Sequence, residues 1–245
     1  MSATVELHAL TSPQLAARLA AGPVIALVPV GSTEPHGPHL GLGTDVAISR
    51  AACVRAVEVL AAAGRAAVIA PAVPYGVTEC AAGFAGAVSV PGPVLTAFVG
   101  AVCDGLVAQG FAQVALVNNH LEPAHDAAIR AVTAGRPQVV IACPLTRRWA
   151  RTLSAEFKSG ACHAGRYETS IVLAAEPALV DEAARAPLAP VPISLSEQLG
   201  KGVTTFAAMG MHDAYAGDPA AATAAEGAEQ IERLAEMIVG ELTPA

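Results

Sequence analysis

Four short, almost uninterrupted apolar runs punctuate the sequence, and longer amphipathic stretches separate them. The runs lie at Val24–Val30, 67–70, 114–118 and 139–143. A strand that is apolar at nearly every position is typically covered on both faces, which is the environment of a parallel strand. Because these runs alternate with helical segments, the sequence predicts an α/β fold with a mostly parallel sheet.

The segments between the runs carry helix signals such as Ser12-Pro13, a capping residue followed by proline at the first helical position. We predict helices over residues 12–22, 45–63, 94–109, 123–133, 146–157, 167–175 and 220–242. Residues 71–93 are rich in proline and glycine, which predicts a long irregular segment near the surface that is either functional or contains undetected short structure. No linker or internal repeat interrupts the pattern, so a single domain over residues 1–245 is expected.

Composition limits the classes of partner. The net charge of -7, from 14 basic and 21 acidic residues, argues against a nucleic-acid partner, which requires clustered Lys and Arg. No apolar stretch has the ~18 residues that a membrane span needs, and no signal peptide is visible, so a cytoplasmic protein is expected. With 53% hydrophobic and only 14% charged residues, part of the exterior is expected to be buried in a homo-oligomer.

Two clusters of histidine and carboxylate follow two of the predicted strands. Glu34, His36 and Asp45 lie in the loop after Val24–Val30, while His120 and Glu122 follow the run at 114–118. Loops at the carboxyl ends of parallel strands share one edge of the sheet, where ligands bind. Glu34 and His36 are two residues apart, and so are His120 and Glu122. In extended backbone, side chains at this spacing point the same way.

Nitrogen and oxygen ligands without thiolate suit Zn²⁺, Mn²⁺ or Fe²⁺, and we predict two divalent ions per chain. Asp45 is the predicted bridge, because a carboxylate has two oxygens to share. A single histidine–carboxylate pair more often caps a helix or lies in solvent, so the prediction of a metal site depends on both pairs together. His39 is expected to hydrogen-bond a ligand carboxylate.

A third cluster, Cys162-His163-Ala-Gly165-Arg166-Tyr167-Glu168, precedes an apolar helix. In one interpretation, Glu168 is only a first-turn acid that the helix dipole favours. In the other, His163 is a general acid and base, and Glu168 is a metal ligand or supports one. Spacing alone does not choose between them.

These segments together resemble the creatininase (creatinine amidohydrolase) family: Gly31-Ser-Thr-Glu-Pro-His-Gly-Pro-His-Leu, Thr44-Asp45, the Asn-x-His strand end and His163-Ala-Gly-x-x-Glu-Thr-Ser. The resemblance implies a three-layer α/β/α sandwich, commonly a hexamer, with a binuclear Zn, Mn or Fe site that hydrolyses amide C–N bonds. It implies that Glu34, His36, Asp45 and His120 are ligands, and that either Glu122 or Glu168 completes the metal shell. Glu122 matches an acid of creatininase itself, and His163 matches the proposed proton shuttle, so these two are the expected catalytic residues.

The departures from that family concern the substrate. Leu121 stands where creatininase has an aromatic residue, and aromatic side chains are few, so creatinine itself is not the expected substrate. We predict cleavage of a small amide, cyclic amide or formamide. The alternatives are a metallopeptidase that trims a short peptide, as in relatives that process a cofactor precursor, and a catalytically silent metal-binding scaffold. The residues expected to contact substrate are Tyr75, Leu121, Trp149, Lys158 and Arg166, of which Lys158 and Arg166, with Arg148, can bind an anionic group.

Overall fold

A four-stranded parallel sheet forms the centre of the computed structural model, which describes residues 6–242. Its strands are β1 (Val24–Val30), β2 (Ala66–Ile69), β3 (Gln113–Asn118) and β4 (Val139–Ala142), in the order β2-β1-β3-β4. Each neighbouring pair is parallel. The predicted α/β fold is therefore confirmed, and the strands match the four apolar runs closely.

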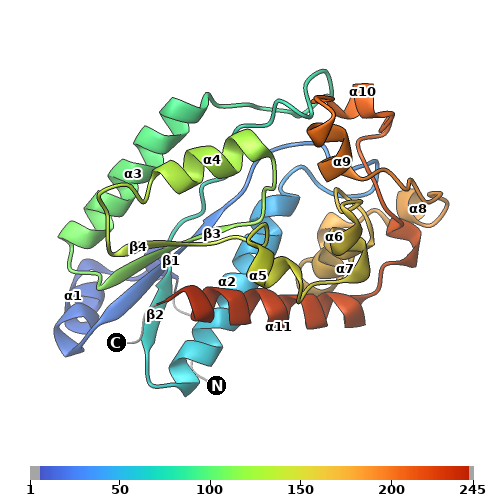
Figure 1. Cartoon of the computed structure of the whole chain (residues 1–245). Coiled ribbons are helices and arrows are strands. Elements are labelled where there is room, and N and C mark those ends of the chain that lie inside the picture. The colour runs from blue at the N-terminus through green and yellow to red at the C-terminus, as the bar shows by residue number, and fades with distance from the viewer. Residues whose placement is uncertain (1–5, 243–245) are drawn as a thin grey trace.

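Helices surround this sheet (Figure 1). The α-helices are α1 (Ser12–Ala21), α2 (Thr44–Ala62), α3 (Gly92–Ala108), α4 (Pro123–Ala131), α5 (Arg147–Ala150), α6 (Ala155–Ser159), α7 (Arg166–Ala175), α8 (Glu182–Arg185), α9 (Leu195–Gly200), α10 (Phe206–Met209) and α11 (Ala224–Glu241). Short 3₁₀ turns lie at Leu7–Ala9, Pro177–Leu179 and Pro219–Ala221. Among residues 6–242, no helix is both long and apolar enough to cross a membrane.

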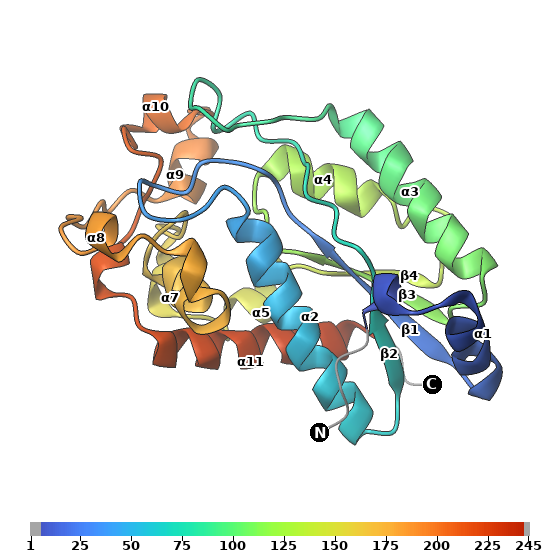
Figure 2. The same cartoon turned by 180° about the vertical axis from the view of Figure 1, so that it is seen from behind.

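The central strand β1 explains why the sheet has helices on both faces. All seven of its residues are buried, and successive side chains point to opposite faces. Ile25 and Leu27 pack with residues of α2, α7 and α11, whereas Val24, Ala26 and Val28 pack with residues of α3 and α4. Figures 1 and 2 show these helix layers on the two sides of the sheet, which is the expected α/β/α sandwich.

The order of the strands places the candidate site. The chain leaves β1 for β2 at one edge and later returns to form β3 on the other side of β1. Loops that follow β1 and β3 therefore diverge and leave a crevice between them, which is where open α/β sheets bind ligands. The loop after β1 carries Glu34 and His36, and the loop after β3 carries His120 and Glu122.

Two predicted helices differ from the structure. The helix expected over 146–157 is two short helices, because Leu153 is buried between them and the Ser154 hydroxyl caps α6 by accepting from Phe157 N–H at 3.2 Å. The terminal helix begins at Ala224 instead of 220, because the Thr223 hydroxyl accepts from Glu226 N–H at 3.2 Å. A capping hydroxyl fixes where a helix begins.

A small third hydrophobic cluster lies apart from the two sheet faces. It joins the short helices α9 and α10, which the sequence analysis did not predict, to residues 80–87. Phe206 and Met209 of α10 pack there with Cys80 and Ala81, and Phe206 N–H donates to the carbonyl of Cys80 at 2.8 Å. This cluster holds one wall of the pocket described below.

Candidate metal centre

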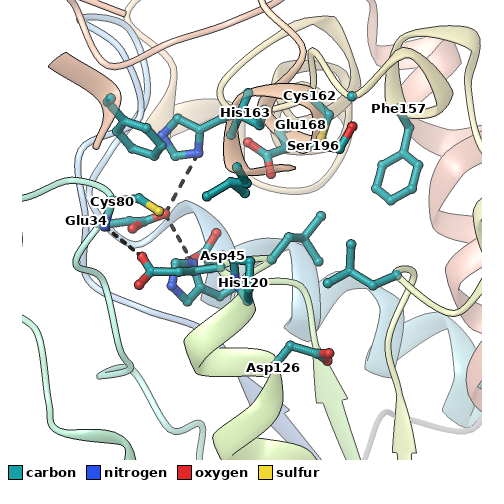
Figure 3. Close-up of a pocket in the computed structure, with 18 of the residues that line it drawn as sticks. Glu34, Asp45, Cys80, His120, Asp126, Phe157, Cys162, His163, Glu168 and Ser196 are labelled. Atoms are coloured by element: carbon teal, nitrogen blue, oxygen red, sulfur yellow. Dashed lines mark hydrogen bonds and ion pairs between the residues drawn. The ribbon is translucent and has the colours of Figure 1, made fainter. Parts of the chain in front are cut away.

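Asp45 lies between His36 and His120, two histidines that come from different loops. Figure 3 shows Asp45 beside His120. It lies in the first turn of α2, and the backbone at Gly31 passes so closely that a Cβ there would be 2.6 Å from Asp45 Cβ. Its Oδ1 atom is 3.2 Å from His36 Nε2, and its Oδ2 atom is 3.0 Å from His120 Nδ1. The carboxylate therefore offers one oxygen to each side of the centre.

His120 is oriented by a hydrogen bond on its outer side. Its Nε2 atom is 2.7 Å from the carbonyl oxygen of Val77, so Nε2 carries the proton and donates. The other nitrogen, Nδ1, then faces inward, 3.2 Å from Glu34 Oε1. A histidine fixed in this way by a carbonyl is the usual arrangement of a metal ligand.

His36 provides the corresponding nitrogen on the other side. Its Nδ1–H donates to the carbonyl of Glu34 at 3.2 Å, while Nε2 is buried without a hydrogen-bond partner. A buried polar atom without a partner is costly in free energy. Because Nε2 faces carboxylate oxygens of Asp45 and Glu168, its position fits a metal ion that would share these ligands.

Glu168 and Glu122, the two alternatives for completing the metal shell, lie on opposite sides of the centre. Glu168 joins His36 and Asp45 in one group of potential ligands, and its Oε2 accepts from Ala164 N–H at 2.6 Å. Glu122 joins Glu34 and His120 in another group, and its carboxylate accepts from the N–H groups of Glu79 and Cys80 at 3.1 and 3.0 Å. The structure thus brings all six expected ligands together.

The buried carboxylates of the centre need positive charge to compensate them. Burial raises the pKa of Glu168 to about 8. Burial alone would lower the pKa of His36, but the carboxylates of Asp45, Glu168 and Glu34 together outweigh it and raise that pKa to about 10. For His120, Glu34 and Asp45 likewise raise the pKa well above its usual value despite burial. Protonated histidines thus compensate the buried carboxylates, and divalent cations can take over that role with neutral imidazole ligands.

His163 lies beside the centre with one nitrogen free. Its Nε2–H donates to the carbonyl of Pro35 at 3.0 Å, and its Nδ1 is 3.9 Å from Glu34 Oε1. The ring lies between those of His36 and Phe206, with centroid separations of 4.5 and 4.3 Å. Burial, and next the positive charge of His36, lower the pKa of His163 to about 4, so its Nδ1 is an acceptor at neutral pH.

Residues 77–80 support the centre, although the sequence analysis placed 71–93 near the surface. Besides the Val77 carbonyl on His120, the Thr78 hydroxyl donates to the Glu34 carboxylate, and two N–H groups donate to Glu122. The sequence signals these contacts only through the glycines and prolines of the segment, which allow its backbone to pass close to other residues. Contacts made by main-chain atoms do not depend on side-chain type, so they cannot be recognised from a motif. His39 also differs from expectation, because its Nε2 lies 2.9 Å from the hydroxyl of Thr169 instead of bonding a ligand carboxylate.

A cavity of about 560 Å³ opens beside the candidate ligands. Glu34, Asp45, His120, Glu122, His163 and Glu168 line it at the metal centre. The apolar wall is made by Leu121, Leu145, Phe157, Leu195, Leu199 and Phe206. Figure 3 shows Phe157 across the cavity from the cluster of Glu34, Asp45 and His120.

Of the residues expected to contact substrate, Leu121 and Lys158 line this cavity, whereas Tyr75, Trp149 and Arg166 are not among its lining residues. Trp149 is buried with its indole N–H donating to the Glu241 carboxylate, and Arg166 pairs with Glu226. Tyr75 is 48% exposed. Residue type suggested these contacts, but the direction of each side chain depends on its tertiary neighbours.

Comparisons with known proteins agree with this geometry. The family model for creatininase (creatinine amidohydrolase) matches residues 8–242. The chain is 34% identical to a mycofactocin precursor peptide peptidase of Mycolicibacterium smegmatis, over 88% of this chain and 82% of that protein. It is 32% identical to a creatinine amidohydrolase of Pseudomonas putida, over 50% of this chain and 47% of that protein.

Solved structures show the same relationship. A manganese creatininase has 25% sequence identity and a TM-score of 0.69, with coverage of 97% of this chain and 96% of that one. A crystal structure of creatinine amidohydrolase aligns over 100% of both chains with a TM-score of 0.72 and 24% identity. The match to the family model spans nearly the whole chain, and this protein therefore belongs to the creatininase family of metal-dependent hydrolases.

Proposed function

We propose that the protein is a binuclear metal-dependent amidohydrolase whose substrate is a short peptide. The observation that carries the metal site is the carboxylate of Asp45, which presents one oxygen toward His36 and the other toward His120. Glu168 extends the first side, and Glu34 with Glu122 extends the second. When bound, two divalent ions of the Zn, Mn or Fe type supply an activated water and polarise the amide carbonyl.

The side chains of the protein then move the protons. His163 is the group with a free nitrogen toward the centre, because its other nitrogen is held by the Pro35 carbonyl. Nδ1 accepts a proton from the attacking water and donates it to the leaving nitrogen, which makes His163 both base and acid. Glu122, which the sequence analysis also named as catalytic, acts in this scheme as a ligand held by two backbone N–H groups.

Two observations support a peptide as the substrate. A cavity of about 560 Å³ is in the range that holds drug-sized ligands, and its apolar wall suits bulky side chains beside the amide. The relative from Mycolicibacterium smegmatis, matched over most of both chains, is a peptide peptidase. The non-peptide amide predicted from sequence remains the second candidate, favoured by the match to a creatinine amidohydrolase over half of the chain.

One panel of substrates separates the two candidates. Protein loaded separately with Zn²⁺, Mn²⁺ and Fe²⁺ is incubated with short peptides bearing apolar residues, with creatinine and other cyclic amides, and with formamides. We expect kcat/KM to be highest for the peptides. Higher values for cyclic amides or formamides would instead assign the non-peptide reaction. No turnover of any amide by fully loaded protein would support the scaffold alternative and reject the enzyme.

We also propose that the chain forms a homo-oligomer, with the hexamer as the specific expectation. Val94 and Phe98 lie one turn apart on α3 and are 56% and 57% exposed, which leaves apolar surface for a second subunit to cover. Light scattering after size-exclusion chromatography tests this. A mass of one chain, 24.5 kDa, would contradict it.

A further inference from the structure

His125 is a buried histidine that the proposed reaction does not use. It lies on α4, is fully buried, and its ring meets that of His120 edge to face at 4.6 Å between centroids. Its Nε2 is 3.1 Å from Asn118 Oδ1, and its Nδ1 accepts from Val77 N–H at 3.3 Å.

The backbone of Val77 connects this histidine to the metal centre. The N–H of Val77 donates to His125, while the carbonyl of Val77 accepts from His120 Nε2 at 2.7 Å. That carbonyl fixes the tautomer of His120 and thereby which nitrogen faces Glu34 and Asp45. The backbone at Gly76 lies against the same ring, since a Cβ there would be 2.3 Å from His125 Nδ1.

We infer that His125 is a positioning residue, which holds the Val77 carbonyl in place so that His120 presents Nδ1 to the metal. The inference rests on the proposed metal site. It predicts that the interaction with Val77, more than the one with Asn118, determines metal affinity. Hydrogen-bond partners that orient a ligand histidine typically change metal affinity about 10–100-fold when they are removed.

Two substitutions separate the two contacts of His125. In His125→Asn, the amide oxygen takes the place of Nδ1 and can still accept from Val77 N–H, but nothing reaches Asn118. In His125→Gln, the amide nitrogen takes the place of Nε2 and can still donate to Asn118, but the acceptor for Val77 is lost. Both variants remove the imidazole, so loss of ring packing is common to them.

A second pair of variants tests the same connection from the backbone side. Gly76→Ala places a methyl group on the His125 ring without removing a hydrogen-bonding group. Gly92→Ala is the matched control, because a Cβ there meets Ala128 at 3.7 Å and Val77 Cγ2 at 4.0 Å, which are ordinary contacts. Circular dichroism and thermal unfolding of the metal-free proteins establish that each variant is folded.

The measurement is Zn²⁺ affinity by competition with a chromophoric chelator, together with the absorption spectrum of the Co²⁺-loaded proteins. We expect His125→Gln and Gly76→Ala to lose about 10–100-fold in affinity, with altered Co²⁺ spectra, while His125→Asn and Gly92→Ala stay close to the unchanged protein. Equal losses in His125→Asn and His125→Gln, or no loss in Gly76→Ala, would overturn the positioning role alone. Absence of Zn²⁺ uptake by the unchanged protein would overturn the metal site and the inference with it.

Discussion

The Oε2 atom of Glu168 lies 3.6 Å from Nε2 of His36, and both side chains are buried. This contact makes Glu168 more than a first-turn acid of α7, because it adds a second carboxylate beside His36 Nε2, which already lies 3.2 Å from Asp45 Oδ1. Glu122 does the same on the His120 side.

Glutamine at either position is therefore expected to remove one metal ion. In Glu168→Gln and in Glu122→Gln, we expect elemental analysis to show a fall from about two ions per chain to about one, because a neutral amide is a weaker ligand than a carboxylate. Glu156→Gln is the control, since that carboxylate accepts from the N–H groups of Tyr167 and Asp218 and faces no histidine of the centre. Unchanged metal content in Glu168→Gln would remove that residue from the ligand set.

Loss of the bridge should be more severe than loss of either flanking acid. Asp45→Asn is expected to reduce kcat/KM by about 10³-fold or more, because the Asp45 carboxylate faces both histidines and metal assistance contributes several kcal/mol. Steady-state kinetics at saturating Zn²⁺ or Mn²⁺ measure this. Asp104→Asn, at a surface residue paired with Arg136, is the control. Near-normal turnover by Asp45→Asn would contradict the mechanism.

The proton shuttle should affect chemistry without affecting metal binding. His163→Ala is expected to lower kcat by about 10²–10⁴-fold, the usual contribution of a positioned acid and base, and to leave both ions in place. Kinetics and elemental analysis on the same sample test both parts. A variant that loses metal along with activity would instead make His163 a ligand, as its proximity to Glu34 and His36 permits.

The pH profile should report the environment of His163. The imidazole must be neutral to accept a proton, and burial lowers its pKa to about 4, so in protein kept saturated with metal the contribution of His163 to kcat/KM should be lost only as the pH drops toward that value. In Phe206→Ala, water reaches the ring, the pKa moves up toward 6.5, and the acidic limb moves with it. Phe157→Ala is the control, because its ring packs on Tyr167. Identical acidic limbs in the two variants would contradict this assignment.

Metal uptake should release protons at pH 7. In the metal-free protein, Glu168 with a pKa of about 8 and His36 with a pKa of about 10 both hold a proton at this pH, and ligands must lose it. Calorimetry of Zn²⁺ binding in buffers of different ionisation enthalpy counts these protons. We expect Glu168→Gln to release about one fewer. Equal release by the two proteins would show that Glu168 binds no proton.

The same pKa shifts set the stability of the metal-free protein. A folded state that binds more protons than the unfolded state loses stability as the pH rises. Glu168 and His36 both have pKa values raised above those of unfolded chains, so this loss should be seen between pH 6.5 and about 8. Denaturant titrations at several pH values measure it, and Glu168→Gln should show a shallower loss. A stability that rises across this interval would contradict the raised values.

The sequence alone determined the sheet and the edge at which the site lies. A run such as Val24–Val30 is apolar on both faces and can only be buried between layers, so its strand and its parallel setting follow from local composition. The motif loops follow the strands β1 and β3, which places their side chains at one crevice. Membership in the creatininase family could also be recognised from the sequence, because the motifs of the family are short and contiguous.

Only the tertiary structure decided how those side chains are held and which others join them. The Val77 carbonyl and the Thr78 hydroxyl contact His120 and Glu34 across more than forty residues of chain, and nothing in their local sequence marks these contacts. Trp149 similarly turned to Glu241 of the terminal helix and away from the cavity. Strand burial is a property of a few consecutive residues, whereas a hydrogen bond between distant segments depends on the packing of the whole fold.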